Sequence, residues 1–151
     1  MTSLGAFTQV APELEPVLEE LRRHEPIFHT EEFGRTPADF DRRMAPGYWE
    51  VGGSGRRYSR GFILAGLTEH PPLDAAVAGW GCSDFGLRQL GLETYLLTYT
   101  LRQGERVTRR ATVWERTASG WQILYHQGTI VAGVEDDTIP GPHELSRPHI
   151  A

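Results

Sequence analysis

The sequence predicts an α+β fold, in which a curved antiparallel sheet wraps around N-terminal helices to form a cone-shaped α+β barrel. Helical patterns and helix-capping residues occupy the first half of the chain. Long runs rich in aromatic and β-branched residues, which favour strands, occupy the second half. The 151 residues suffice for one hydrophobic core. We therefore expect one domain over 12–131, an N-terminal extension (1–11) and an extended C-terminal segment (132–151).

The first predicted helix covers residues 12–28. Leu18 and Leu21 belong to an apolar stripe with helical spacing, and charged residues lie on the other side. Pro16 fits only the first turn of a helix, so regular structure should begin just before it. Pro26 should kink or end this helix.

A second, shorter helix is expected over 37–44. Thr36 followed by Pro37 is a typical helix start, because the hydroxyl caps the first turn and proline suits its first position. Pro46 and Gly47 are expected to end the helix.

A hairpin and a third helix should follow. A short strand over 48–51 leads into the glycine-rich turn 52–55, and residues 56–58 return as its partner strand. Ser59 is a suitable cap for a helix over 60–67.

The strand pattern dominates the rest of the domain. Residues 73–84 give no clear assignment, and 85–90 predict a strand. Three longer strands over 93–102, 107–117 and 121–131 are separated by short turns and should form an antiparallel meander.

Composition narrows the class of protein. The formal net charge is −5, whereas a dedicated nucleic-acid binder usually presents a basic face. The single cysteine, Cys82, excludes an intramolecular disulfide, and no apolar run approaches the roughly 20 residues that cross a bilayer. We expect a cytoplasmic protein without nucleic-acid or membrane partners. The six histidines lack a metal-ligand spacing, so neither a metal nor a cofactor is predicted.

Three stretches resemble the nuclear transport factor 2-like superfamily, which includes ketosteroid isomerase, scytalone dehydratase and the SnoaL-like polyketide cyclases. They are GYWEVGGSGRRYSR (47–60), RRATVWERTASGW (109–121) and YHQGT (125–129). The chain is most similar to bacterial members of the superfamily that are domains of unknown function. The resemblance implies a cone-shaped pocket and a homodimer formed through the outer face of the sheet.

Strand alternation predicts which side chains face the space between sheet and helices. A turn over 117–120 would place Thr112 opposite Tyr125 and Arg110 opposite Gln127. A turn over 102–105 would place Tyr95 beside Thr112 on the other side. The pocket face would then carry Glu93, Tyr95, Leu97, Tyr99, Arg110, Thr112, Trp114, Trp121, Ile123, Tyr125 and Gln127. The opposite face would carry Ala111, Val113, Leu124 and His126. A slip of one residue would exchange the two sets.

Glu50 is the predicted catalytic carboxylate. By the resemblance it lies near the general base of ketosteroid isomerase, and Thr112 lies near the acid of that enzyme's oxyanion hole. Partial desolvation beside Trp49 would raise the pKa of Glu50 into a range suited to proton transfer. The alternative is a solvent-exposed strand glutamate, and a threonine hydroxyl replaces the isomerase's acid poorly.

The predicted ligand-binding residues are Trp49, Tyr58, Tyr95, Tyr99, Arg110, Thr112, Trp114, Tyr125 and Gln127. Arg110 and Gln127 would hold a carboxylate or carbonyl, or else hydrogen-bond across strands at the pocket rim. The aromatic residues suit a hydrophobic core as well as a pocket wall. For His126 we favour burial at a dimer contact, or a hydrogen bond within the sheet, over acid–base chemistry.

Three functions therefore remain open. The first is a small-molecule-binding protein with an aromatic-lined pocket for an organic ligand that carries an oxygen function. The second is a cofactor-free isomerase, dehydratase or cyclase with Glu50 as general base. The third is a protein-interaction module that acts through the sheet surface.

Overall fold

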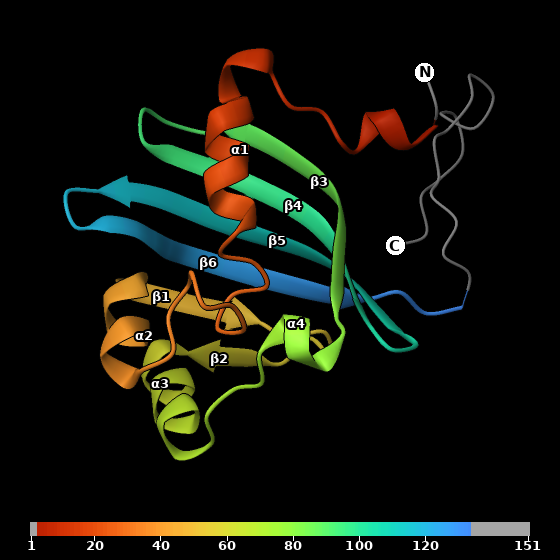
Figure 1. Cartoon of the computed structure of the whole chain (residues 1–151). Helices are drawn as coiled ribbons and strands as arrows, with labels where there is room; N and C mark the ends of the chain where they lie inside the picture. Colours follow the sequence, from red (N-terminus) through yellow and green to blue (C-terminus); the bar gives the residue numbers. More distant parts are fainter. Residues whose placement is uncertain (1–2, 134–151) are drawn as a thin grey trace.

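The computed structural model describes residues 3–133 (Figure 1). Two short 3₁₀ turns, Ser3–Ala6 and Pro12–Leu14, precede the other elements. The helices are α1 (Glu15–Arg22), α2 (Pro37–Arg43), α3 (Arg60–Glu69) and α4 (Ala75–Ala78). The strands are β1 (Met44–Val51), β2 (Arg57–Ser59), β3 (Gly81–Gln89), β4 (Thr94–Gln103), β5 (Arg106–Thr117) and β6 (Gly120–Ile130). None of the described helices is long and apolar enough to cross a membrane.

The strands form one six-stranded sheet in the order β2–β1–β6–β5–β4–β3. The predicted α+β arrangement of a sheet packed on helices is confirmed. The sheet is mixed rather than wholly antiparallel, because β1 and β6 run parallel. The chain between them contains two helices and four strands, which provides the long connection that a parallel pair needs. The strands β2 and β3 are the two edges of the sheet and are not joined to each other, so the cone is not closed.

The core lies between the sheet and the segment that contains α1 and α2. Leu21, Phe33 and Phe40 from this segment are essentially inaccessible to solvent and belong to the same cluster as Trp114 and Leu97 of the sheet. We call this side of the sheet the inner face; on β4 and β5 it carries Tyr95, Leu97, Tyr99, Arg110, Thr112 and Trp114. The other side is the outer face; on the same strands it carries Leu96, Thr98, Arg109, Ala111 and Val113.

The predicted inner-face residues of β4 and β5 lie where they were expected, although the pairing differs. Thr112 lies opposite Leu97 rather than Tyr95, because the turn at Gly104 is tighter than predicted. A shift by two residues preserves the face of every side chain, since the strand repeat is two residues.

In β6 the predicted faces are wrong after Ile123. Trp114 pairs with Ile123 as predicted, but Val113 pairs with Tyr125, so Leu124 is an extra residue in a β-bulge. The bulge turns His126 to the inner face opposite Thr112, where it is 2% exposed. Tyr125 and Gln127, which we expected to face the pocket, lie on the outer face instead.

Several element boundaries also differ from those predicted. The first helix ends at Arg22, well before Pro26. Pro46 and Gly47 lie inside β1, which begins directly after α2. Proline has no backbone N–H to donate, and the pairing between β1 and β6 shifts register between Met44 and Trp49. From residue 134 onward, the predicted C-terminal segment lies outside the described residues.

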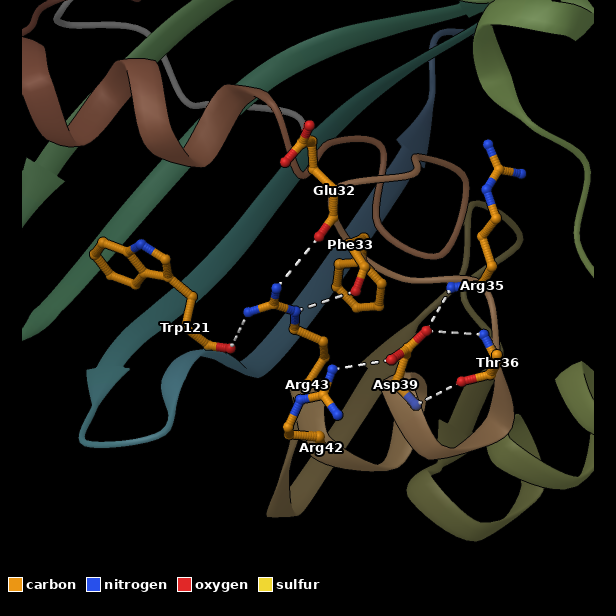
Figure 2. A network of polar contacts seen from close by, with 8 residues as sticks. All are labelled: Glu32, Phe33, Arg35, Thr36, Asp39, Arg42, Arg43 and Trp121. Carbon is orange, nitrogen blue, oxygen red and sulfur yellow. Dashed lines mark hydrogen bonds and ion pairs between the residues drawn. The ribbon is translucent and has the colours of Figure 1, made fainter.

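A polar network ties α2 to the rest of the domain (Figure 2). Thr36 and Asp39 form a capping box, in which each side chain accepts a hydrogen bond from the other's backbone N–H. At the end of the helix, the guanidinium of Arg43 donates to the carbonyl oxygens of Phe33 (3.1 Å), Trp121 (3.1 Å) and Glu32 (3.2 Å). Arg43 thus joins α2, the preceding loop and the start of β6.

We expect Arg43→Ala to lower the free energy of unfolding by about 2–4 kcal/mol, because three carbonyls lose a charged donor and two of these hydrogen bonds are partly buried. Arg42→Ala is the matched control, since Arg42 makes an exposed ion pair with Asp39 that is worth about 0–1 kcal/mol. Urea unfolding followed by circular dichroism measures both. Equal losses in the two variants would contradict the role given to Arg43.

Candidate functional site

A buried carboxyl group, Glu25, lies between the helices and the inner face. Its Oε1 accepts hydrogen bonds from the Tyr99 hydroxyl (2.6 Å) and the Ile27 backbone N–H (3.1 Å). Its Oε2 accepts one from Trp114 Nε1 (3.0 Å). Burial raises the pKa of Glu25 above its ordinary value, and hydrogen bonds from Tyr99, Thr112 and Trp114 only partly oppose this effect. The group is therefore biased toward the neutral acid.

A chain of hydrogen bonds leads from Glu25 along the inner face to a guanidinium. Arg110 Nη1 lies 3.3 Å from His126 Nε2, and His126 Nδ1 lies 2.7 Å from Thr112 Oγ1. Arginine can only donate, so Nε2 must accept and Nδ1 carries the proton. Nδ1 then donates to Thr112 Oγ1, and a hydrogen bond with the Thr112 side chain lowers the pKa of Glu25. The donors therefore run in one direction, from Arg110 through His126 to Thr112.

The imidazole of His126 is held neutral in this chain. Burial, together with the positive charge of Arg110, lowers the pKa of His126 to about 3. Arg110 is itself fixed by a 2.9 Å hydrogen bond from Nε to Thr108 Oγ1. It also lies flat against Gly128, where a Cβ atom would come within 3.2 Å of Nε. The bulge at Leu124 brings Gly128, rather than Gln127, opposite Arg110.

Glu50 also lies on the inner face, next to Arg110. Its Oε2 accepts a 2.7 Å hydrogen bond from the Tyr48 hydroxyl, and it pairs across strands with Tyr58 and His126. Burial raises the pKa of Glu50, whereas the Tyr48 hydrogen bond and the charge of Arg110 oppose the rise. The predicted general base is thus half-buried and has a positioned partner, as proton transfer requires.

The inner face nevertheless leaves little room for a ligand beside its polar groups. Trp114 and Thr112 are inaccessible to solvent, and Tyr99 and His126 are each 2% exposed. The aromatic rings pack edge to face, as between Trp114 and Phe33 with centroids 6.2 Å apart. The predicted aromatic residues of this face therefore act as core.

A hollow of about 710 Å³ lies on the outer face. The sheet forms its floor, and the N-terminal segment around Phe7 forms one wall. Its apolar lining includes Leu96, Ala111, Val113 and the ring of Tyr125. Its polar lining includes Gln9, Asp84, Arg88, Thr98, Thr100, Arg109, Gln127 and Thr129. The hollow spans strands β3 to β6.

Gly86 and a bulge in β3 shape the wall of the hollow. A Cβ atom at Gly86 would lie 2.7 Å from the backbone oxygen of Phe7, so only glycine lets the N-terminal segment cross the strand this closely. The segment is held there by a 3.1 Å hydrogen bond from the Leu87 N–H to the Gln9 oxygen. The pairing of β3 with β4 shifts at Asp84, whose φ of 60° is left-handed.

Two polar contacts order the rim of the hollow. Arg109 Nη1 donates to Thr100 Oγ1 at 2.7 Å and lies 3.7 Å from Asp84 Oδ2. The Tyr125 hydroxyl donates to Gln127 Oε1 at 2.6 Å, which leaves the amide N–H groups of Gln127 as donors. The geometry thus combines an apolar floor with a few fixed polar groups, as small-molecule sites do.

The predicted site residues divide between the two faces. Glu50, Tyr58, Tyr95, Tyr99, Arg110, Thr112 and Trp114 have side chains on the inner face. Trp49, Tyr125 and Gln127 have theirs on the outer face, where the Trp49 and Tyr125 rings meet edge to face at 4.9 Å. Among the described residues, no group of three or more histidine, cysteine, aspartate or glutamate side chains could hold a metal ion.

Sequence reasoning missed Glu25 and the outer hollow. One signal for Glu25 was present, because it continues the helical spacing of Leu18 and Leu21 and therefore occupies an apolar position of the pattern. The hollow left no such signal, since it depends on the bulges in β3 and β6 and on the path of the N-terminal segment.

Comparisons with known proteins show the fold of the chain. No family model and no curated protein matches it. A protein of unknown function from Pectobacterium atrosepticum, of the DUF3225 family, superimposes with a TM-score of 0.59 and 16% identity, over 82% of this chain and 94% of that one. An NTF2-like protein from Cytophaga hutchinsonii gives 0.55 and 11%, over 81% and 100%.

A third solved structure has a more specific description. It is a putative calcium/calmodulin-dependent protein kinase II association domain from Xanthomonas campestris, with a TM-score of 0.56 and 15% identity, over 84% of this chain and 96% of that one. At these identities the matches show the fold alone. They confirm the predicted NTF2-like cone fold and its presence in bacterial proteins of unknown function.

The buried acid gives a prediction for stability against pH. Above pH 4.5, the ordinary pKa of this carboxyl group, the unfolded chain loses the Glu25 proton while the folded chain retains it. The stability that Glu25 adds to the folded state is therefore complete below pH 4.5. The contribution is lost as the pH rises through the raised folded pKa. Glu25→Gln cannot ionise, so its stability relative to the wild type should increase from pH 4.5 to pH 8.

Urea unfolding at several pH values measures this difference. At pH 4.5 the variant should be less stable by about 1–3 kcal/mol, because the new amide N–H₂ meets a donor such as Trp114 Nε1. The exposed Glu31→Gln is the control and should keep a constant difference from the wild type. A constant difference for Glu25→Gln as well would show that the carboxyl group has no raised pKa.

Proposed function

We propose that this protein binds a small organic molecule in the outer hollow. The observation that carries the proposal is the volume of about 710 Å³ on an apolar floor, which lies within the usual range of about 300–1,000 Å³ for such sites. Tyr125 and Gln127, which the sequence suggested as ligand-binding residues, line this hollow. The ligand would lie across β4 and β5 against Leu96, Ala111 and Val113.

The lining favours binding over catalysis at this hollow. The two carboxyl groups with raised pKa values, Glu25 and Glu50, lie on the inner face. The carboxylate in the hollow, Asp84, is paired with Arg109. The titratable groups best suited to proton transfer are thus separated from the hollow by the sheet.

A cofactor-free isomerase, dehydratase or cyclase is the second candidate. Glu50 would be its general base, and the 2.7 Å hydrogen bond from Tyr48 together with the nearby Arg110 supports that role. A substrate would need to enter from the side of Tyr58, which pairs with Glu50 at the edge of the sheet.

A protein partner on the outer face is the third candidate. The predicted homodimer through the sheet would use this face, and Trp49, which is exposed and packs against the ring of Tyr125 in the hollow, supports it. A second copy and a small molecule would then compete for the same surface, or the second copy would enclose the hollow.

Fluorescence titration with N-phenyl-1-naphthylamine, a neutral apolar probe, tests the proposal. The wild type should bind it with one saturable site, and Ala111→Trp should weaken binding by about tenfold or more, because an indole fills the floor of the hollow. Ala118→Trp, in the β5–β6 turn, is the matched control and should bind like the wild type. Thermal unfolding should show that both variants are folded.

Light scattering separates the protein partner from the small molecule. If the wild type has twice the mass of the 16.9 kDa chain and Ala111→Trp has the mass of one chain, the outer face joins copies. Unchanged probe binding by Ala111→Trp would overturn the small-molecule proposal. Loss of binding in Glu50→Gln, with Ala111→Trp unaffected, would move the site to the inner face.

A further inference from the structure

We infer that the ligand of the outer hollow is an apolar molecule with one anionic group, such as a carboxylate, and that this group lies beside Arg88. The inference rests on the proposed function and adds the chemical class of the ligand. It follows from the charges that line the hollow, the pairing of each charge and the surplus of hydrogen-bond donors at the rim.

The charged lining of the outer face is positive. Its charged residues are Asp84, Arg88, Arg109 and Arg110. Arg110 directs its guanidinium to the inner face, toward Thr108 and His126. Two arginines and one aspartate remain on the outer face, which gives the hollow one positive charge on a chain whose net charge is −5.

Arg88 provides this surplus charge. Asp84 lies 3.7 Å from Arg109 and balances that guanidinium. Arg88 pairs across strands with Leu96, so its side chain leaves β3 on the outer face. It is exposed and makes no ion pair with any residue in the described part of the chain. Its guanidinium can therefore pair with a ligand.

The neutral polar groups of the rim also favour an acceptor. The oxygen of the Gln127 side chain is occupied by the Tyr125 hydroxyl, so its amide presents donors. An ionised carboxylate accepts hydrogen bonds and cannot donate them, and it pairs with a guanidinium through two parallel bonds. The apolar body of the ligand would cover Leu96, Ala111 and Val113.

Two probes that share a ring system test the charge. N-Phenyl-1-naphthylamine and 8-anilinonaphthalene-1-sulfonate have the same aromatic body, and only the second carries an anion. The wild type should bind the anionic probe about five- to tenfold more tightly than the neutral one at low salt. Arg88→Gln should abolish this preference and leave the neutral probe unchanged, whereas Arg88→Lys should retain most of it.

Arg57→Gln is the matched control, because it removes the same charge from the exposed strand β2. It should not change the preference, and 0.5 M NaCl should reduce the preference in the wild type. An equal loss in Arg57→Gln would overturn the inference, since the preference would then reflect the overall charge.

The outcomes also separate the inference from the proposed function. If Ala111→Trp blocks binding of the neutral probe but the wild type shows no preference for the anionic probe, the anionic ligand is refuted. The binding site itself is then still supported. Probe binding that Ala111→Trp does not affect refutes the site itself. A preference for the anionic probe that survives in Arg88→Gln assigns the anion to another group and overturns the role of Arg88.

Discussion

The extra residue at Leu124 in β6 decides what each face of the sheet carries. Without it, the alternation that places Trp121 and Ile123 in the core would continue and put Tyr125 and Gln127 there as well. With it, His126 enters the core and the two longer polar side chains leave it. The hydrogen-bonded chain inside and the contact between Tyr125 and Gln127 at the outer rim both depend on this irregularity.

The inner chain is stable because every member has a partner. Buried polar groups are costly when unsatisfied, and among residues 5–133 no buried side-chain nitrogen or oxygen lacks a hydrogen bond. A charged imidazole would break the chain, because both of its nitrogens would donate and Nε2 could no longer accept from Arg110. Arg110 therefore sets the direction of the chain and, second to burial, lowers the pKa of His126.

The sequence was sufficient to predict the fold class, the capped start of α2 and the inner faces of β4 and β5. Those features rest on short-range patterns, and the error of two residues at Gly104 left the faces unchanged. The face of Tyr125 and Gln127 was not predictable in this way, because a β-bulge depends on the partner strand and has no reliable signature in one sequence. Glu25 lies inside because residues distant in the chain, Tyr99 and Trp114, supply its hydrogen bonds.

The separation of the two faces bears directly on function. Glu25 and Glu50 have raised pKa values because they are buried, and the packing that buries them also leaves them little room for a substrate. The outer hollow has the room, and its carboxylate is already paired with Arg109. A catalytic site needs a titratable group and a cavity on the same face. In this chain the bulge in β6 sends His126 inward and the longer donors outward, so the face with the cavity is equipped to hold a ligand rather than to transform it.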